Sequence, residues 1–196
     1  RMKKNHMWIG AGVIVVVIAL ACLSSYNSIV RLDQAVTAAW AQVETDYQRR
    51  SDLVPNLVAT VKGAIGFETK TLLEVTQARA NATSIKLTTS QLTAENISSY
   101  EDAQAKLGGS LGRLIAIAEN YPTLTATESF RGLQTQLEGT ENRIAVSRKD
   151  FNSAVEEYNA TIKTFPNALL APMYGFAPRA YFESGAGSET APEVAF

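Results

Sequence analysis

The stretch MWIGAGVIVVVIALACL, residues 7–23, constrains the fold of this chain more than any other feature, because it contains no charged side chain. At about 1.5 Å per residue, a helix from Met7 to Tyr26 covers about the 30 Å of a bilayer's hydrocarbon core. Trp8 and Tyr26 stand near its ends, where aromatic rings favour the membrane boundary. We therefore predict a transmembrane helix over 7–26. The side chains assigned to the span are Met7, Trp8, Ile9, Val13, Ile14, Val15, Val16, Val17, Ile18, Leu20 and Leu23.

The charges around this segment predict its orientation. Arg1, Lys3 and Lys4 precede it, and few charges follow it. Positive charge stays on the cytoplasmic side, so we expect a cytoplasmic N-terminus and an extracytoplasmic remainder. Two alternatives stay open: a cleaved signal peptide, and a lipoprotein in which Cys22 carries the lipid, although Ala19 stands where such proteins usually have leucine.

Composition then excludes several classes of protein. The 196 residues are 46% apolar and 19% charged, which is typical of a folded chain. The single histidine, His6, and the single cysteine, Cys22, exclude a disulfide framework, a Cys/His zinc site and a Ser-His-Asp triad in the rest of the chain. The net charge of −1 argues against nucleic-acid binding. We predict no catalytic residue, no metal site and no cofactor.

Apolar residues recur at helical spacing from Ser28 to about Phe165, which predicts an all-α domain. The first stripe continues the membrane segment without a break and consists of Ile29, Val36, Trp40, Val43 and Tyr47. Pro55 either kinks this helix or ends it, and the stripe beyond it keeps the same phase through Val54, Leu57 or Val58, Val61, Ile65, Leu72 and Val75. Both alternatives stay open, so the expected antiparallel bundle has three or four long helices.

Two further helices follow a predicted loop over 83–93. One runs from about Glu95 to Asn120 with an inward face of Leu107, Leu111, Leu114, Ile115 and Ala118. Its glycines Gly108, Gly109 and Gly112 predict close approach of another backbone. Tyr121-Pro122 ends this helix, and Thr125 or Thr127 is expected to cap the next one.

The last helix carries a seam with a period of seven residues, formed by Phe130, Leu137, Ile144, Phe151, Tyr158 and Phe165, with Leu133, Val155 and Ile162 between them. We interpret the seam as the core of an antiparallel bundle; an intermolecular coiled coil is the alternative. A tail rich in proline and glycine follows over 166–196 and is predicted to be extended. Its aromatic half either packs on the bundle or offers an apolar strip to a partner through Met173, Tyr174, Phe176, Tyr181 and Phe182, and 184–196 are expected to be disordered.

Charged side chains on the helices admit two interpretations. Pairs such as Glu138 with Glu141, and Glu156 with Glu157, could contribute to a carboxylate-only metal site, but a solvated lattice of ion pairs is favoured. That lattice is expected to include Glu141, Asn142, Arg143, Arg148, Lys149 and Asp150. The adjacent Arg49 and Arg50, beside Pro55, could also hold carboxylates of another helix.

Several long segments resemble the LemA family of bacterial membrane-anchored helical proteins: SSYNSIVRLDQAVTAAWAQVE, YQRRSDLVPNLVATVKG, TQARA, LEGTENRIAVSR, FNSAVEEYNATIKTFP and APMYGFAPRAYFE. The residues that carry the family motifs are Arg49, Arg50, Pro55, Asn56, Glu138, Glu141, Asn142 and Arg143. The segment AIGFE at 64–68 departs from the family, whose members tend to have tyrosine and histidine there.

The resemblance implies a short N-terminal segment at 1–6, a span at 7–26 and a helical bundle at 27–165, in the bacterial inner membrane. No catalytic activity is established for the family. Some of its genes lie near those of membrane-bound proteases, so such a protease or another membrane protein is a candidate partner, besides membrane lipid and further copies of the chain. We expect a scaffold or adaptor that is not an enzyme; the alternatives are a membrane-remodelling protein and a carboxylate-based metal-dependent hydrolase.

Overall fold

The computed structural model describes the backbone of residues 2–63 and 69–183, and their side chains except those of 2–9 and 11. This part of the chain is all-α, as predicted. Its long helices are α1 (Met2–Lys62), α2 (Thr69–Ser84), α3 (Ala94–Ala118) and α5 (Glu128–Lys163). Short helical turns are η1 (Thr89–Gln91), α4 (Pro122–Thr125), α6 (Asn167–Leu170) and η2 (Pro172–Tyr174).

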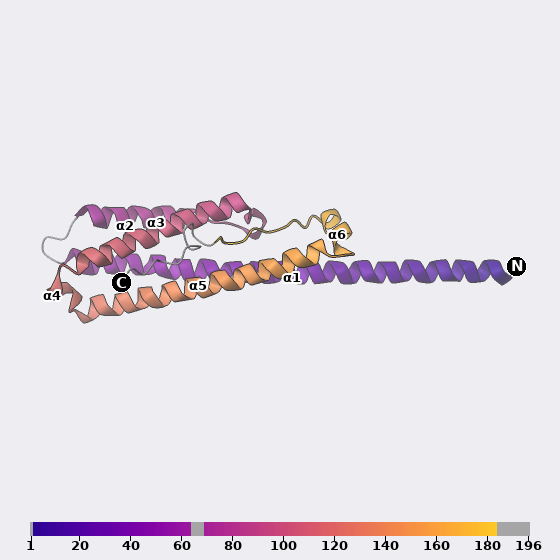
Figure 1. Ribbon diagram of the computed structural model, residues 1–196, viewed down its shortest axis with the longest axis horizontal. Helices are drawn as coiled ribbons and strands as arrows, with labels where there is room; N and C mark the ends of the chain where they lie inside the picture. The colour runs from indigo at the N-terminus through magenta and orange to yellow at the C-terminus, as the bar shows by residue number, and fades with distance from the viewer. Residues whose placement is uncertain (1, 64–68, 184–196) are drawn as a thin grey trace, which may run out of the picture.

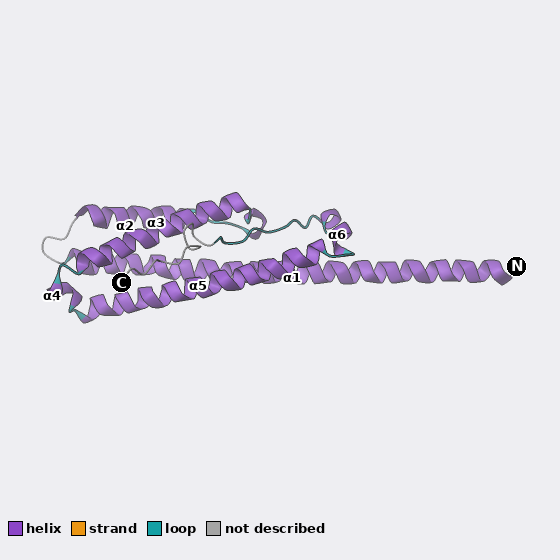
Figure 2. Cartoon of the chain, viewed as in Figure 1, coloured by secondary structure: helices purple, strands orange, loops and turns teal. Residues whose placement is uncertain are grey.

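The helices form an elongated bundle from which one end of α1 projects alone (Figure 1). Helix α5 packs along α1, while α2 and α3 pair with each other beside them. The chain then turns through α6 at the end of the bundle from which α1 projects, and the segment after η2 returns along the bundle as a loop (Figure 2). The tail predicted as extended therefore begins with two short helical turns.

Helix α1 continues through Pro55, which settles the alternative that the sequence left open. The break that creates the additional long helix comes after Lys62, so Leu72 and Val75 belong to the separate helix α2. Ile65 and the segment 64–68 lie outside the described residues. The bundle thus has four long helices among the residues described, but Pro55 is not the reason.

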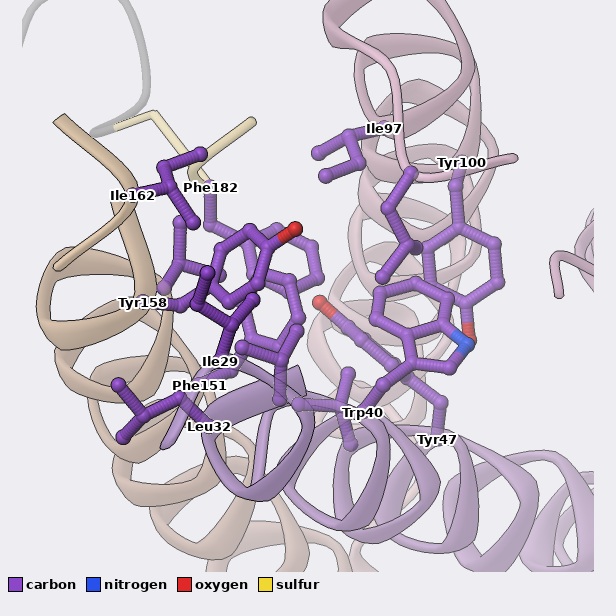
Figure 3. Packing of buried hydrophobic residues seen from close by; sticks show 14 of the residues in the cluster. Ile29, Leu32, Trp40, Tyr47, Ile97, Tyr100, Phe151, Tyr158, Ile162 and Phe182 are labelled. Atoms are coloured by element: carbon purple, nitrogen blue, oxygen red, sulfur yellow. The ribbon is translucent and has the colours of Figure 1, made fainter. Parts of the chain in front are cut away.

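The described core divides into two clusters along the bundle. The cluster nearer the projecting end of α1 is rich in aromatic side chains around Trp40 (Figure 3). The Trp40 ring lies 5.3 Å from Tyr100 on α3, 5.5 Å from Phe151 on α5 and 5.8 Å from Phe182 in the tail, measured between ring centroids. Its indole Nε1 donates a hydrogen bond to the Leu87 carbonyl at 3.1 Å. The second cluster, near α4, is mostly aliphatic.

The seam predicted for the last helix lies inside the bundle, where α5 meets α1. Its buried members are Phe130, Leu137, Ile144, Phe151, Val155, Tyr158 and Ile162. Thr127, one of the two threonines expected to cap this helix, does so by accepting a hydrogen bond from the Phe130 N–H. Phe165 was wrongly assigned to the seam: α5 ends at Lys163, and the Phe165 side chain is 83% exposed.

Helix α3 follows its predicted inward face, which is buried except for the half-buried Ile115. The prediction that another backbone approaches the glycines of this helix is wrong: a side chain lies beside one of them, and the other two are open. A Cβ atom on Gly108 would lie 3.3 Å from Nη1 of Arg50, whereas one on Gly109 or Gly112 would meet nothing within 4 Å.

Candidate functional site

The projecting part of α1 is exposed and apolar. From Val13 to Leu23 its large side chains are 56–65% exposed, and this helix is long and apolar enough to cross a bilayer. The predicted side chains of Met7, Trp8 and Ile9 lie outside the described ones. From Ile29 onward, one face of the same helix is buried in the bundle. Such a surface is consistent with a membrane-associated protein, because water-soluble helices do not leave all their faces apolar.

Further along α1, a buried arginine links three helices. Arg50 on α1 donates from Nη2 to the backbone carbonyl and to Oε1 of Gln104 on α3, both at 2.8 Å. Its Nη1 donates to Oε1 of Glu141 on α5 at 3.0 Å. The side chain is 4% exposed, and its guanidinium also lies 5.0 Å from the centroid of the Tyr47 ring. The prediction that an arginine beside Pro55 holds a carboxylate of another helix is therefore correct for Arg50.

A second arginine accounts for the continuity of α1 at Pro55. Proline has no N–H, so the carbonyl of Ser51, four residues earlier, loses its helical hydrogen-bond partner. Ser51 is buried, and an unpaired buried carbonyl is costly. Arg79 on α2 supplies the missing donor, since its Nε lies 2.8 Å from the Ser51 carbonyl oxygen. The family motifs around Pro55 and TQARA thus meet in one contact.

The other motif residues lie on the surface. Arg49 and Asn56 on α1, and Glu138, Asn142 and Arg143 on α5, are exposed. A groove of about 420 Å³ between the two helices is lined by Arg49 and Arg143 among others. The structure therefore separates the motif into Arg50, whose buried guanidinium pairs with the half-exposed Glu141, and an exposed group beside it.

A cleft of about 560 Å³ between α1, α3 and α5 is lined by charges of both signs: Arg50, Arg148, Glu101, Asp102, Glu141 and Glu183. Arg148 pairs with Glu101 and also donates to the Glu183 carbonyl at 2.9 Å. Burial raises the pKa of the Glu101 carboxyl, and the Arg148 guanidinium partly opposes that shift. Glu141 and Arg148 form ion pairs, as the lattice prediction has it, but with Arg50 and Glu101 of other helices, while Asn142, Arg143, Lys149 and Asp150 are exposed.

The tail is held on α5 by two asparagines that the sequence analysis missed. Asn152 donates to the Phe182 carbonyl at 2.9 Å and accepts from its N–H at 2.8 Å. Asn159 forms the same pair of bonds with Arg179, at 2.8 and 2.9 Å. Seven helical residues rise about 10.5 Å, and three extended residues cover about 10 Å, so the two spacings match. The signal that could have found this clamp is an asparagine repeated at the period of the seam.

The apolar side chains of the tail differ in how far they pack on the bundle. Phe182 is buried against Trp40, and Phe176 packs partly on the same cluster. Met173, Tyr174 and Tyr181 remain 78%, 41% and 42% exposed. Residues 184–196, which were expected to be disordered, lie outside the described residues.

The described acidic side chains do not gather as metal ligands would: over the described ranges, no three His, Cys, Asp or Glu side chains come together. Glu138 accepts a hydrogen bond from Gln134 at 3.2 Å, and Glu156 and Glu157 are exposed on α5. Cys22 is a free, partly exposed thiol close to the end of the apolar segment. The arginines described above contact carboxylates and main-chain carbonyls of other segments, an arrangement that fixes helices relative to each other.

Comparison with known proteins finds relatives and a family for this chain. Magnetosome protein MamQ 2 and Magnetosome protein MamQ 1 of Paramagnetospirillum magneticum, and Magnetosome protein MamQ of Magnetospirillum gryphiswaldense, are each 36% identical to this chain over 88 residues. That match covers 45% of this chain and 32% of each relative, so the chain spans about a third of the length of these relatives. The family model described as the LemA family matches residues 39–196, and this chain therefore belongs to the LemA family.

Proposed function

We propose that this protein is a membrane-anchored scaffold or adaptor that assembles with itself or binds other membrane proteins, and that it is not an enzyme. The observation that carries the proposal is the continuity of α1 from its exposed apolar part into the core of the bundle. The 61 residues of this helix correspond to a rod of about 90 Å. Such a rod would transmit the position of the anchor directly to the bundle, with no linker between them.

The way in which charged groups are used in the bundle supports the non-enzymatic part of the proposal. Arg50, Arg79 and Arg148 each make hydrogen bonds to the main chain or to a carboxylate of another helix. These contacts hold α2, α3 and α5 at defined positions on α1. Metal analysis of the purified protein tests the alternative of a carboxylate-based hydrolase, which requires bound metal in stoichiometric amount.

Anchoring favours assembly through weak contacts, because a protein confined to a membrane meets its neighbours at a raised effective concentration. The outer faces of α2 and α5 are available for such contacts and expose the apolar side chains Leu73 and Val146. From the charges before the span we further propose a cytoplasmic N-terminus and a bundle outside the bacterial inner membrane. Whether Cys22 carries a lipid is tested by the mass of the purified chain.

The experiment that tests the scaffold proposal measures the stoichiometry of the full chain in lipid nanodiscs and identifies its neighbours in cells. A photo-crosslinking amino acid at Val146 and at Leu73 samples the two exposed faces, and the same amino acid at the buried Phe151 is the matched control. We expect a defined oligomer, or defined crosslinked partners from an exposed position and none from the control. A monomer in nanodiscs, with no crosslinks above the control at either exposed face, would contradict the proposal.

A further inference from the structure

The turn between α5 and the returning tail exposes an unusual set of apolar side chains. We call residues 164–175 the α6 turn, since they contain α6 and η2. Phe165, Leu169 and Met173 are 83%, 66% and 78% exposed. They recur every fourth residue along a short segment, whereas large exposed apolar residues on the described faces of α2 and α5 stand singly. Single exposed apolar residues are ordinary on a protein surface, but a cluster of them indicates a contact.

The α6 turn contacts α1 at one level along the helix axis, near Ser25 and Tyr26. Asn167 is hydrogen-bonded to the side chain of Ser25, and the Tyr174 ring lies 5.0 Å from the Tyr26 ring in an edge-on arrangement. Phe176 lies 6.1 Å from the same Tyr26 ring. Ala171, in the middle of the turn, is buried in the core cluster. The turn is therefore packed on the bundle, while its side chains Phe165, Leu169 and Met173 remain exposed.

The level at which the turn contacts α1 coincides with the end of the apolar segment of this helix. The exposed apolar face ends at Leu23, and Ser25 is the first described residue of α1 that is buried by the bundle. If the segment spans from Met7, Tyr26 stands about 30 Å further along the helix, which is the thickness of the hydrocarbon core. The α6 turn would then lie where the headgroups meet the acyl chains, the zone that aromatic and amphipathic side chains favour.

We propose that the α6 turn is a lipid-binding collar, which inserts Phe165, Leu169 and Met173 into the leaflet from which α1 emerges. The proposal rests on the membrane anchoring in the proposed function. The occupant is the bilayer surface, because the α6 turn contacts α1 at Ser25 and Tyr26, directly beyond its exposed apolar face, and α6 lies at the end of the bundle from which the anchor projects (Figure 1). Two contacts with the bilayer, the span and the collar, would hold the bundle at a fixed tilt.

The test measures the depth of single positions in vesicles of phosphatidylcholine. The full chain with Cys22→Ser receives one new cysteine, Leu169→Cys or Met173→Cys, which carries a fluorophore. Val146→Cys is the matched control, since Val146 is also exposed and apolar but lies about 26 Å further from the turn along α5. Leu20→Cys reports on the span itself. Nitroxide-labelled lipids, with the nitroxide near the glycerol end of the acyl chain, are present in both leaflets, so either orientation of the chain gives the same signal.

The collar predicts that nitroxide lipid quenches the labels at 169 and 173 several-fold more strongly than the label at 146. Weak quenching at 169 and 173, equal to that at 146, together with strong quenching at 20, would overturn the collar and leave the anchor intact. Weak quenching at all positions would remove the anchor and the collar with it. A blue shift at 169 and 173 without quenching, found only at high protein density, would show a second copy of the chain on the turn and would also overturn the proposal.

Discussion

The contact between Arg79 and the helix at Pro55 makes a quantitative prediction. Replacement Arg79→Met keeps most of the side-chain volume but leaves the buried Ser51 carbonyl without its donor at 2.8 Å. An unsatisfied buried carbonyl costs about 1–3 kcal/mol, so we expect this variant to lose about 2 kcal/mol of unfolding free energy. The replacement Pro55→Ala restores the N–H that the carbonyl lacks. In that background Arg79→Met should cost less than about 1 kcal/mol, because the helix then satisfies its own carbonyl.

The assay is a double-mutant cycle on the full chain in mild detergent, with urea unfolding followed by far-UV circular dichroism. The expected coupling between Pro55 and Arg79 is about 1–2 kcal/mol. Arg113→Met is the matched control, because Arg113 pairs with Glu74 at the surface and its side chain is 66% exposed. Its own effect should stay below about 1 kcal/mol, with no coupling to Pro55. Equal costs of Arg79→Met in the two backgrounds would refute the explanation given for the uninterrupted α1.

Three further predictions concern the same bundle. Arg50→Met should destabilise the fold by about 3 kcal/mol, because two buried hydrogen bonds to Gln104 are lost. Glu141→Gln should cost about 1 kcal/mol or less, since Glu141 is half exposed. Urea unfolding compares the two variants, and equal losses of unfolding free energy would contradict the greater weight given to the contacts with Gln104. Gly109→Ala should raise the melting temperature, because alanine adds about 1 kcal/mol of helix propensity. Gly108→Ala should raise the melting temperature less, because its Cβ would lie 3.3 Å from Arg50. A larger increase for Gly108→Ala would count against the packing described. Burial raises the pKa of the Tyr100 phenol in the folded protein above its ordinary value near 10. The stability that the protonated phenol contributes is therefore complete below pH 10 and is lost as the pH rises above 10. The Tyr100→Phe variant should show a shallower alkaline decline in unfolding free energy, and an unchanged decline would contradict this explanation.

The seam and the stripes could be predicted from the sequence, because burial at helical spacing is a local property of the chain. The position of the helix break could not. A proline inside a helix costs about 3 kcal/mol by local rules, and the group that offsets part of this cost is Arg79, which belongs to another helix. Phe165 shows the opposite limit: the seven-residue period continues past the end of α5, so the pattern alone does not mark where the helix ends.

The candidate site was predictable only in outline. Arg50 and Glu141 could be named as motif residues, but their meeting across two helices depends on the register of α1 against α5. The clamp formed by Asn152 and Asn159 was missed because a polar residue on a helix ordinarily faces water. Its partners are backbone groups of the tail, and backbone groups carry no signature in the sequence.

The insertion of Phe182 beside Trp40 has a consequence for the order in which the protein is made. A ribosome releases residue 182 only after all four long helices have been synthesised, yet this ring fills part of the centre between α1, α3 and α5. In a nascent chain tethered by its first helix, the position of the Phe182 ring beside Trp40 would therefore stay unfilled until the returning segment has been synthesised. Completion of the bundle is thereby tied to completion of translation through this point.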